Sequence, residues 1–405
     1  MRILKPFSIL MMLKKNYPCS HAMLETVYTH LLPQRGHTVT WIMPSGDSRR
    51  IRDWDLVSWN GTIVYLLEGD KHRKNIPKLI GRFTRQYKAV RYILQNEKVD
   101  ILQVRNDWIS GLIGVFAQKR WGIPFVYQVS YPVPEAMRAS GGWRKLLGMF
   151  AKQTERVLLR EAALVLPISR WMQQRFEIGG VPAGKMMEFP LGADTSVRPE
   201  EIDGQEVRQR LGIEGHPIVI YFGAMDRIRQ LDFLLRAVAR LARAMPEVRL
   251  LLVGDSEKQA DLEWLMSLPK VLGISENVIF TGRVPRTEVP KYIAAADLSV
   301  SPIVPLSIYL ISSPTKLVES MAMAKPVVAN DIPEQKHILA QSGAGICTGY
   351  DEEQFAEAMK WLLQHPIEAR EMGTRGRRFI EEQRSFDVLA RKIEQAYSKL
   401  VTQSP

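Results

Sequence analysis

Short apolar segments alternate with helical patterns along the whole chain, and this alternation restricts the fold more than any other feature. A strand followed by a helix and then by another strand builds a parallel sheet with helices on both faces. The pattern runs through the chain twice, so we expect two doubly wound α/β domains. The predicted strands are 7–13, 38–43, 62–67, 101–104, 125–129, 164–168, 218–222, 249–253, 278–281, 298–301 and 326–329, with a weaker one at 345–347.

A polar stretch after residue 192 separates the two patterns, and two domains are also the default for 405 residues. We therefore expect a first domain over 1–192, a linker over 193–216 and a second domain over 217–384. Residues 385–405 hold a final helix, which we expect to pack back on the first domain. Doubly wound sheets bind ligands beyond the carboxyl ends of their strands, so we expect the site in a cleft between the domains.

The net charge of +12 is concentrated in the first half of the chain. Residues 1–200 contain 30 Lys and Arg against 16 Asp and Glu, whereas the other 205 residues contain 25 against 27. This asymmetry indicates an anionic partner for the first half: a membrane surface, a nucleic acid or a phosphorylated substrate.

Two segments favour a membrane surface. From Lys71 to Arg91 there are eight basic residues and no acidic one, interleaved with apolar residues at helical spacing, and residues 142–150 are a second basic and apolar segment. A basic amphipathic helix suits an anionic bilayer. The alternative is that the apolar stripe faces the domain core. The aromatic residues match no nucleic-acid-binding module, so we expect no nucleic acid partner.

Composition excludes several other classes of protein. Cys19 and Cys347 provide neither a disulfide framework nor metal-ligand spacing, which fits a reducing compartment. No apolar stretch approaches the roughly 18 residues of a membrane span. Residues 7–13 could pass for a short signal peptide, but Lys14 and Lys15 follow without a small-residue cleavage site, so we expect a buried strand. No cluster of His, Asp and Glu predicts a metal, and we expect no cofactor.

The segment from Ser313 to Ala329 predicts a helix whose first turn can hold an anion. Ser313 suits the N-cap and Pro314 the first helical position. Lys316 then lies where the helix dipole disfavours a cation by about 0.3–1 kcal/mol, and a bound phosphate would explain it. Glu319 is on the same face and can accept hydrogen bonds from two sugar hydroxyls. The alternative is a surface ion pair between Lys316 and Glu319.

Several segments occur in the order and roughly the spacing of a known family. The chain resembles the GT-B glycosyltransferases, specifically the retaining family 4, or group 1, enzymes that build bacterial polysaccharides. The resemblance spans almost the whole length. The matching segments are 35–39 (Arg-Gly-His-Thr-Val), 190–194 (Pro-Leu-Gly-Ala-Asp), 251–255 (Leu-Leu-Val-Gly-Asp), 280–284 (Phe-Thr-Gly-Arg-Val), 295–298 (Ala-Ala-Asp-Leu) and 313–329.

This resemblance implies a retaining hexosyltransferase that needs no metal. Its donor would be a UDP- or GDP-linked sugar bound by the second domain. Its acceptor would be a saccharide, lipid-linked, bound by the first domain during cell-surface polysaccharide assembly. The enzyme would then be cytoplasmic and peripheral, at the inner face of the cell membrane.

The same resemblance assigns donor-binding residues in the second domain. Arg229, with Arg227 as its partner, would clamp the pyrophosphate beside Lys316, because a forked guanidinium suits a diphosphate. The alternative is two solvated arginines at a helix start. Relatives often have a second Glu where this chain has Ile311, so the sugar would be held by backbone nearby. The remaining assignments are Gly223, Ser313 and Thr315 for the pyrophosphate, Glu319 for the ribose, and Arg283 and Val284 for the base, with Arg283 alternatively a surface loop residue.

The first domain departs further from its relatives. Ser20, His21 and Arg105 are the residues we expect at the acceptor or in the cleft, with His21 alternatively an exposed first-turn residue. Relatives commonly carry a His after the fifth strand, which is absent here. Asp107 and Glu135 are therefore the candidates for activating the acceptor. An internal-return mechanism, in which the leaving phosphate accepts the proton, needs neither.

Two other functions remain open at this point. A nucleotide-sugar epimerase has the same fold, but it uses acidic and His residues around the donor sugar, which are scarce here. A non-catalytic scaffold with a degraded donor site is the other, since the chain carries Ile311 and lacks the expected His.

Overall fold

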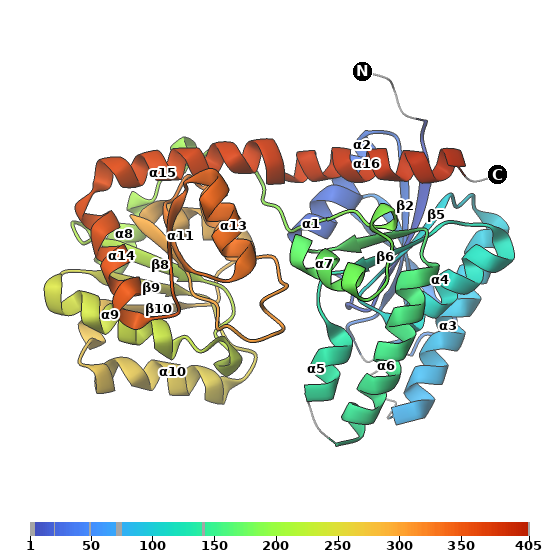
Figure 1. Cartoon of the computed structure of the whole chain (residues 1–405), viewed down its shortest axis with the longest axis horizontal. Helices are drawn as coiled ribbons and strands as arrows, with labels where there is room; N and C mark the ends of the chain where they lie inside the picture. Colours follow the sequence, from blue (N-terminus) through green and yellow to red (C-terminus); the bar gives the residue numbers. More distant parts are fainter. Residues whose placement is uncertain (1–4, 20, 48–49, 70–74, 140–141, 404–405) are drawn as a thin grey trace. The chain divides into compact units, whose positions relative to one another are not determined.

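The computed structural model describes residues 5–19, 21–47, 50–69, 75–139 and 142–403, which divide into two compact units (Figure 1). Unit 1 comprises Met1–Pro190 and Phe386–Pro405, and unit 2 comprises Leu191–Ser385. The segment 193–216, which we expected to be a linker, belongs to unit 2. Its helix α8 (Gln205–Leu211) buries Val207 in the core of that unit.

Unit 1 contains a seven-stranded sheet in the order β3-β4-β2-β1-β5-β6-β7, in which all pairs are parallel except β3 and β4. The predicted parallel sheet of the first half is therefore confirmed. The antiparallel edge strand β3 was not predicted. The strands are β1 (Ser8–Leu13), β2 (Thr38–Pro44), β3 (Asp55–Trp59), β4 (Thr62–Leu67), β5 (Ile101–Arg105), β6 (Phe125–Val129) and β7 (Leu164–Pro167).

Helices cover both faces of this sheet, as the alternation predicts (Figure 1). The helix that follows β1 is continuous over 22–34 but has a π-helical middle, so it is divided at Glu25 and Leu32. The helices are α1 (Ala22–Leu24), the π-helix Glu25–Leu31, α2 (Leu32–Gln34), α3 (Asn75–Asn96), α4 (Trp108–Trp121), α5 (Val133–Ala139), α6 (Gly142–Glu161), α7 (Arg170–Ile178), the 3₁₀ turn Ala183–Lys185 and α16 (Phe386–Gln403).

The C-terminal helix α16 packs on unit 1. Its apolar residues recur at helical spacing and are buried, from Phe386 to Tyr397. Arg35 donates to the carboxylates of Asp387 and Glu394 at 2.6 and 2.9 Å, and His37 contacts Glu394 at 2.9 Å. These contacts join the end of the chain to the segment just before β2.

Unit 2 contains a six-stranded, fully parallel sheet in the order β10-β9-β8-β11-β12-β13. The second predicted parallel sheet is confirmed as well. The elements are the 3₁₀ turn Pro199–Glu201, α8, β8 (Ile218–Phe222), the 3₁₀ turn Arg227–Arg229, α9 (Asp232–Ala244), β9 (Arg249–Val253), α10 (Gln259–Leu272), the 3₁₀ turn Ser275–Asn277, β10 (Val278–Gly282), the 3₁₀ turn Arg286–Glu288, α11 (Val289–Ala295), β11 (Leu298–Ser301), α12 (Thr315–Ala322), β12 (Val327–Asn330), α13 (Pro333–Ser342), β13 (Gly345–Thr348), α14 (Glu352–Gln364), α15 (Pro366–Phe379) and the π-helix Ile380–Arg384.

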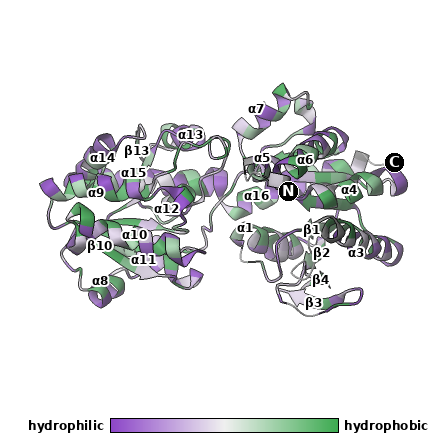
Figure 2. Cartoon of the chain, turned by 90° about the horizontal axis from the view of Figure 1, so that it is seen from below, coloured by the Kyte–Doolittle hydropathy of each residue, from purple (hydrophilic) through white to green (hydrophobic). Residues whose placement is uncertain are grey.

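Alternate residues of the strands in unit 2 pack into two hydrophobic cores, one on each face of the sheet. Val219 and Tyr221 of β8 pack in the core under α9 and α14. Ile220 and Phe222 of the same strand pack in the core under α8 and α11. A period of two is what a strand buried on both faces requires. Figure 2 shows the hydrophobic residues of the sheets and the mixed polarity of the helices that cover them.

In the part of the chain that the structure describes, no helix combines the length and apolarity needed to cross a bilayer.

The connection from α12 to β12 contains a strained residue and gives a test of the backbone in unit 2. Ala324 has a φ of 52°, where an L-residue costs about 1–2 kcal/mol and glycine does not. We expect Ala324→Gly to raise the free energy of unfolding by about 0.5–1 kcal/mol, as measured by denaturant titration. The matched control is Ala340→Gly at an exposed position inside α13, which should lower it by about 1 kcal/mol. Changes of the same sign in both variants would contradict this reading of the backbone.

Candidate functional site

The strand order of unit 2 places a ligand crevice at a defined position. From β8 the chain proceeds to β9 and β10 on one side, and it then crosses to β11 on the other side. A doubly wound sheet opens beyond the carboxyl ends of its strands at such a point. Gly223 directly follows β8, and α12 is the next helix after β11. These two elements are therefore the expected walls of a site.

Glycines allow a close approach of backbone and side chain at this point. Gly223 has a φ of 122°, and a Cβ there would lie 2.7 Å from Cε of Lys316. Gly254, directly after β9, has a φ of 140°, and a Cβ there would lie 2.1 Å from the carbonyl oxygen of Gly223. A Cβ at 254 would collide with backbone, and a Cβ at 223 would displace the Lys316 side chain. The glycines thus let α12 place Lys316 against the end of β8.

Lys316 is a cation without a counter-ion. Its Nζ lies 5.0 Å from the ring centroid of Tyr221, and no described residue forms a hydrogen bond or ion pair with it. Burial, followed by the positive charge of Arg229, lowers the pKa of Lys316 to about 8, although Glu319 opposes the shift. An anion that reaches this amine would stabilise its protonated form.

The structure separates the two predicted arginines of the loop after β8. Arg229 lies over the ring of Tyr309, 5.3 Å from its centroid, and its charge acts on Lys316. Its Nε is buried and makes no hydrogen bond to any described residue. Arg227 instead lies over the ring of Trp264 of α10, at 4.5 Å. Arg229 is thus the arginine that the fold brings to Lys316.

Glu319 lies one turn further along α12. Burial raises the pKa of its carboxyl group, and the charges of Arg286 and Lys316 oppose that rise. Its carboxylate makes no hydrogen bond or ion pair to the described part of the chain. Both oxygens are therefore able to accept hydrogen bonds from a ligand. Binding of ribose hydroxyls by Glu319 stays a prediction.

The start of α12 differs from the prediction by one residue. The helix begins at Thr315, with Pro314 rather than Ser313 at the N-cap. Ser313 is buried, and its Oγ accepts a hydrogen bond from the amide of Leu191 at 3.2 Å. Ser313 therefore anchors the segment where unit 2 begins, and it does not cap the helix. Thr315 is exposed in the first turn, where free amide groups favour an anion.

The residues predicted for the nucleobase follow β10. Arg283 is mostly exposed, with its Nε 3.8 Å from the carboxylate of Asp255. Val284 is half-buried and packs against the core under α8 and α11. Contact of either residue with a base stays a prediction.

Unit 1 has its own crossover between β1 and β5, and two predicted residues meet there. Arg105 ends β5, and His21 follows β1; the guanidinium Nη2 lies 2.9 Å from Nε2 of His21. Arg105 is 6% exposed, and burial lowers its pKa to about 10. Ser20, the third residue predicted here, lies outside the described residues.

The two carboxylates proposed to activate the acceptor are already engaged. Asp107 is buried and caps α4, and it accepts hydrogen bonds from Arg82 at 2.7 Å and from Ser110. Glu135 of α5 accepts from Lys152 and Arg175, and these neighbours hold its pKa below the ordinary value despite its burial. A carboxylate held by cations is a weak base. A catalytic role for either residue stays a prediction.

No group of three or more His, Cys, Asp or Glu side chains suited to a metal occurs among the described residues.

Comparison with known families identifies the class of protein. The model described as "Glycosyl transferase 4-like domain" matches residues 28–192, and "Glycosyl transferases group 1" matches residues 216–365. Together they match more than three quarters of the chain. The chain therefore belongs to the GT-B glycosyltransferases of the group 1, family 4 type, as its sequence resemblance predicted.

Curated relatives point to the same class. A GDP-mannose-dependent alpha-(1-6)-phosphatidylinositol monomannoside mannosyltransferase of Mycolicibacterium smegmatis is 28% identical over 240 residues, which are 58% of this chain and 62% of the relative. A D-inositol 3-phosphate glycosyltransferase of Nocardia farcinica is 29% identical over 278 residues, 66% of this chain and 60% of the relative. The matched part thus spans about three fifths of these relatives.

Solved structures show the fold over nearly the whole chain. Anabaena Alr3699/HepE in complex with UDP superposes with a TM-score of 0.72 at 17% identity, covering 97% of this chain and all of that one. Sucrose-phosphate synthase (tll1590) from Thermosynechococcus elongatus gives 0.77 at 19% identity, covering 98% and 100%. At these identities the likeness shows the GT-B fold alone.

Three residues of the site were not predicted. Tyr221 in β8 was interpreted only as part of an apolar strand, but its ring faces the Lys316 amine. Tyr309 belongs to a loop without periodicity, and its ring stacks against the guanidinium group of Arg229. Arg286, three residues after Arg283, acts on Glu319. For Arg286, the one signal in the sequence was that it is a second basic residue shortly after β10.

The buried amine predicts a stability effect with a defined pH dependence. At pH 7 both the folded and the unfolded chain carry the Lys316 proton, so the folded state bears the full cost of burying the charge. As the pH rises from about 8 to 10.5, the unfolded state binds more protons, and stability increases. Below that window, Lys316→Met should therefore raise the free energy of unfolding, by about 1–2 kcal/mol.

Denaturant titrations of the wild type and of Lys316→Met at pH 7 and pH 10 test this expectation. The difference should shrink at pH 10, where the wild-type amine is neutral in the folded state. Lys316→Arg, which keeps the charge, is the control and should show no such gain. A Met variant less stable than the wild type at pH 7 would refute the unpaired-cation assignment.

Proposed function

We propose that the protein transfers a hexose from a nucleoside-diphosphate sugar to a saccharide acceptor, with retention of anomeric configuration. One observation carries the proposal. Lys316 and Arg229 come together at the crossover of the second sheet, where neither forms an ion pair with a described carboxylate, and Glu319 follows one turn later. Two cations that lack a counter-ion suit a diphosphate, and a free carboxylate suits a ribose.

The reaction follows from these groups. The bond between the anomeric carbon and the diphosphate oxygen breaks, and negative charge grows on the leaving phosphate. Lys316, Arg229 and the first amide groups of α12 stabilise that charge. The acceptor oxygen attacks from the same face, and its proton passes to the departing phosphate oxygen. Since Asp107 and Glu135 are held in ion pairs, this internal return fits the chain better than a protein base.

The named relatives support the donor class. The Anabaena protein was crystallised with UDP and with UDP-glucose, and the Mycolicibacterium enzyme is GDP-mannose-dependent. We therefore propose a UDP- or GDP-linked hexose as donor. We also propose that no divalent metal is needed, because side-chain cations already face the diphosphate site.

We further propose a lipid-linked acceptor, and with it a cytoplasmic enzyme at the inner face of the cell membrane that assembles cell-surface polysaccharide. Unit 1 presents exposed apolar side chains on α3 and α6. The two groups are Ile80 and Phe83 on α3, and Leu146, Met149 and Phe150 on α6.

Only part of the predicted basic helix supports this surface. In α3, Arg82 pairs with Asp107 and Arg85 with Glu68, so neither is free for lipid, whereas Lys88 and Arg91 are exposed. Lys71, Arg73 and Lys74 lie outside the described residues, as does the side chain of Lys78. The apolar patch of α6, beside the exposed Lys145, is thus the stronger membrane contact.

An epimerase remains the alternative enzyme, and a non-catalytic scaffold the alternative non-enzyme. Free altered nucleotide sugar, formed without any acceptor, identifies an epimerase. A scaffold needs no donor, so its biological activity survives loss of Glu319. The position equivalent to the relatives' second Glu, Ile311, is half-buried next to the start of α12.

Nucleotide titration tests the donor site. Glu319→Ala should weaken UDP or GDP binding by about 1.5–3 kcal/mol, because a charged hydrogen-bond acceptor is lost. Calorimetry measures the affinity, and Glu276→Ala, an exposed carboxylate in the same unit, is the control and should bind like the wild type. Chelation with EDTA should leave wild-type binding and transfer intact. The proposal fails if neither nucleotide binds at millimolar concentration.

Liposome sedimentation tests the membrane surface. Leu146→Ser together with Met149→Ser should reduce co-sedimentation with anionic vesicles by at least about tenfold, because apolar area is lost from the contact. Ile178→Ser changes a 90% exposed apolar residue of α7 and is the matched control. Equal sedimentation of all three proteins, or of the wild type with neutral and anionic vesicles, counts against this contact.

A further inference from the structure

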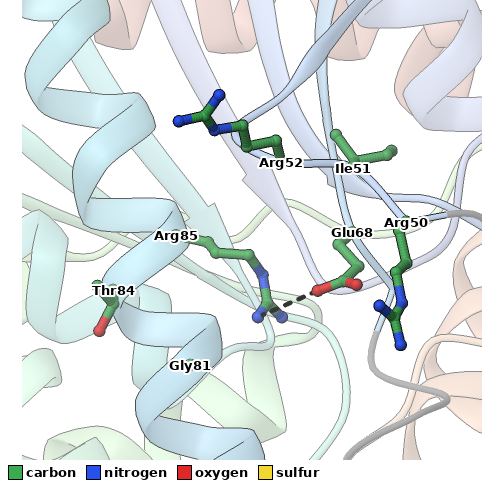
Figure 3. Close-up of a pocket in the computed structure, with 7 residues that line it drawn as sticks. All are labelled: Arg50, Ile51, Arg52, Glu68, Gly81, Thr84 and Arg85. Carbon is green, nitrogen blue, oxygen red and sulfur yellow. Dashed lines mark ion pairs between the residues drawn. The ribbon is translucent and has the colours of Figure 1, made fainter.

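A pocket in unit 1 is lined by residues other than those assigned to the donor. Its volume is about 630 Å³, within the range of about 300–1,000 Å³ typical of small-molecule sites. Its walls come from the segment after β2, from Glu68 directly after β4, and from α3 (Figure 3). Because β2 and β4 are parallel neighbours, the pocket opens at the carboxyl edge of the sheet.

The pocket is strongly cationic. Among the described residues, Arg50, Arg52 and Arg85 line it with one carboxylate, Glu68, so these four side chains have a net formal charge of +2. Arg50 and Arg52 are exposed, and neither makes a hydrogen bond or ion pair with any residue that the structure describes. A phosphate monoester carries about −1.5 to −2 charges at neutral pH, so one such group balances the pocket.

The geometry favours an anion that is part of a sugar. Glu68 lies between the guanidinium groups of Arg50 and Arg85 (Figure 3), and the Arg85 contact of 3.8 Å exceeds a hydrogen-bond length. An entering phosphate or carboxylate can take the exposed guanidinium groups of Arg50 and Arg52 in the bidentate geometry that arginine favours. The Glu68 carboxylate accepts hydrogen bonds from hydroxyls beside that anion.

The pocket also lies near the crossover of the first sheet. Two strands, β2 and β1, stand between β4 and β5, and neighbouring strands are about 4.8 Å apart. An extended saccharide along the carboxyl edge can thus reach both this pocket and the region of Arg105 and His21.

We propose that this pocket binds an anionic group, a phosphate or a carboxylate, on the saccharide acceptor. Arg50 and Arg52 hold the anion, and Glu68, in its ion pair with Arg85, orients the adjoining hydroxyls. The proposal rests on the proposed function, since it assumes that unit 1 binds the acceptor. It adds that the acceptor is negatively charged and that charge, rather than shape alone, selects it.

Calorimetry on the full chain tests the proposal with the donor site filled by UDP or GDP, whichever binds. Glucose 1-phosphate and glucuronate are the anionic probes, and glucose is the neutral one. At least one anionic probe should bind about tenfold or more tightly than glucose. The double variant Arg50→Gln and Arg52→Gln should lose that preference, whereas Arg91→Gln, an exposed arginine of α3 outside the pocket, should keep it.

Substitution of Glu68 gives a second test, in which the affinity for an anion should rise instead of falling. Glu68→Gln removes the negative charge that competes with the ligand, so inorganic phosphate should bind several-fold more tightly. Thermal unfolding of each variant shows whether it is folded. Weaker phosphate binding by a folded Glu68→Gln variant overturns the assignment, as does equal binding of the anionic probe by the wild type and the double variant.

Two further experiments show whether the donor site, the acceptor pocket or the choice of anion is wrong. Lys316→Ala should abolish nucleotide binding and leave the sugar anion bound, so nucleotide binding that persists in this variant counts against the donor site and not against this pocket. Vesicles with and without phosphatidylglycerol test a lipid headgroup as the anion. If the double variant loses vesicle binding while the wild type ignores both sugar anions, the pocket binds lipid and the acceptor proposal is wrong.

Discussion

The second unit depends on one unfavourable contact, in which α12 places the Lys316 amine against the end of β8 and no described carboxylate forms an ion pair with it. The contact requires glycine at 223 and at 254, because a Cβ at either position would collide with its neighbour. It lowers the pKa of Lys316 to about 8 and brings Arg229 close enough to contribute to that shift. Such an arrangement destabilises the unliganded fold, and a bound diphosphate would remove the penalty.

Periodicity was enough to predict most of the fold. Each predicted strand is present within one or two residues, because strands buried on both faces form continuous apolar runs. The edge strand β3 was missed, since the polar residues Asp55 and Ser58 interrupt its apolar run. The Asn60-Gly61 turn between β3 and β4, with both residues at positive φ, was the signal that could have revealed it.

The candidate site was predictable only where a residue type is out of place. Lys316 in a first helical turn and Glu319 one turn on could be selected for that reason. Which of Arg227 and Arg229 faces the site depends on the rings of Trp264 and Tyr309, which lie far away in sequence. Spacing along one segment cannot contain that information. The same holds for Glu135, whose partners Lys152 and Arg175 come from two later helices.

The excess charge of unit 1 has to be assigned residue by residue, because its arginines serve different purposes. Arg35, Arg82 and Arg175 are held by carboxylates of other segments, so they stabilise the fold and offer little to a partner. Arg105 is buried beside His21 at the crossover. Arg50 and Arg52 are exposed and unpaired among the described residues, at the rim of a pocket that already contains Arg85. Net charge alone therefore overstates the surface available to a membrane, and it conceals a cationic pocket whose size suits part of a sugar.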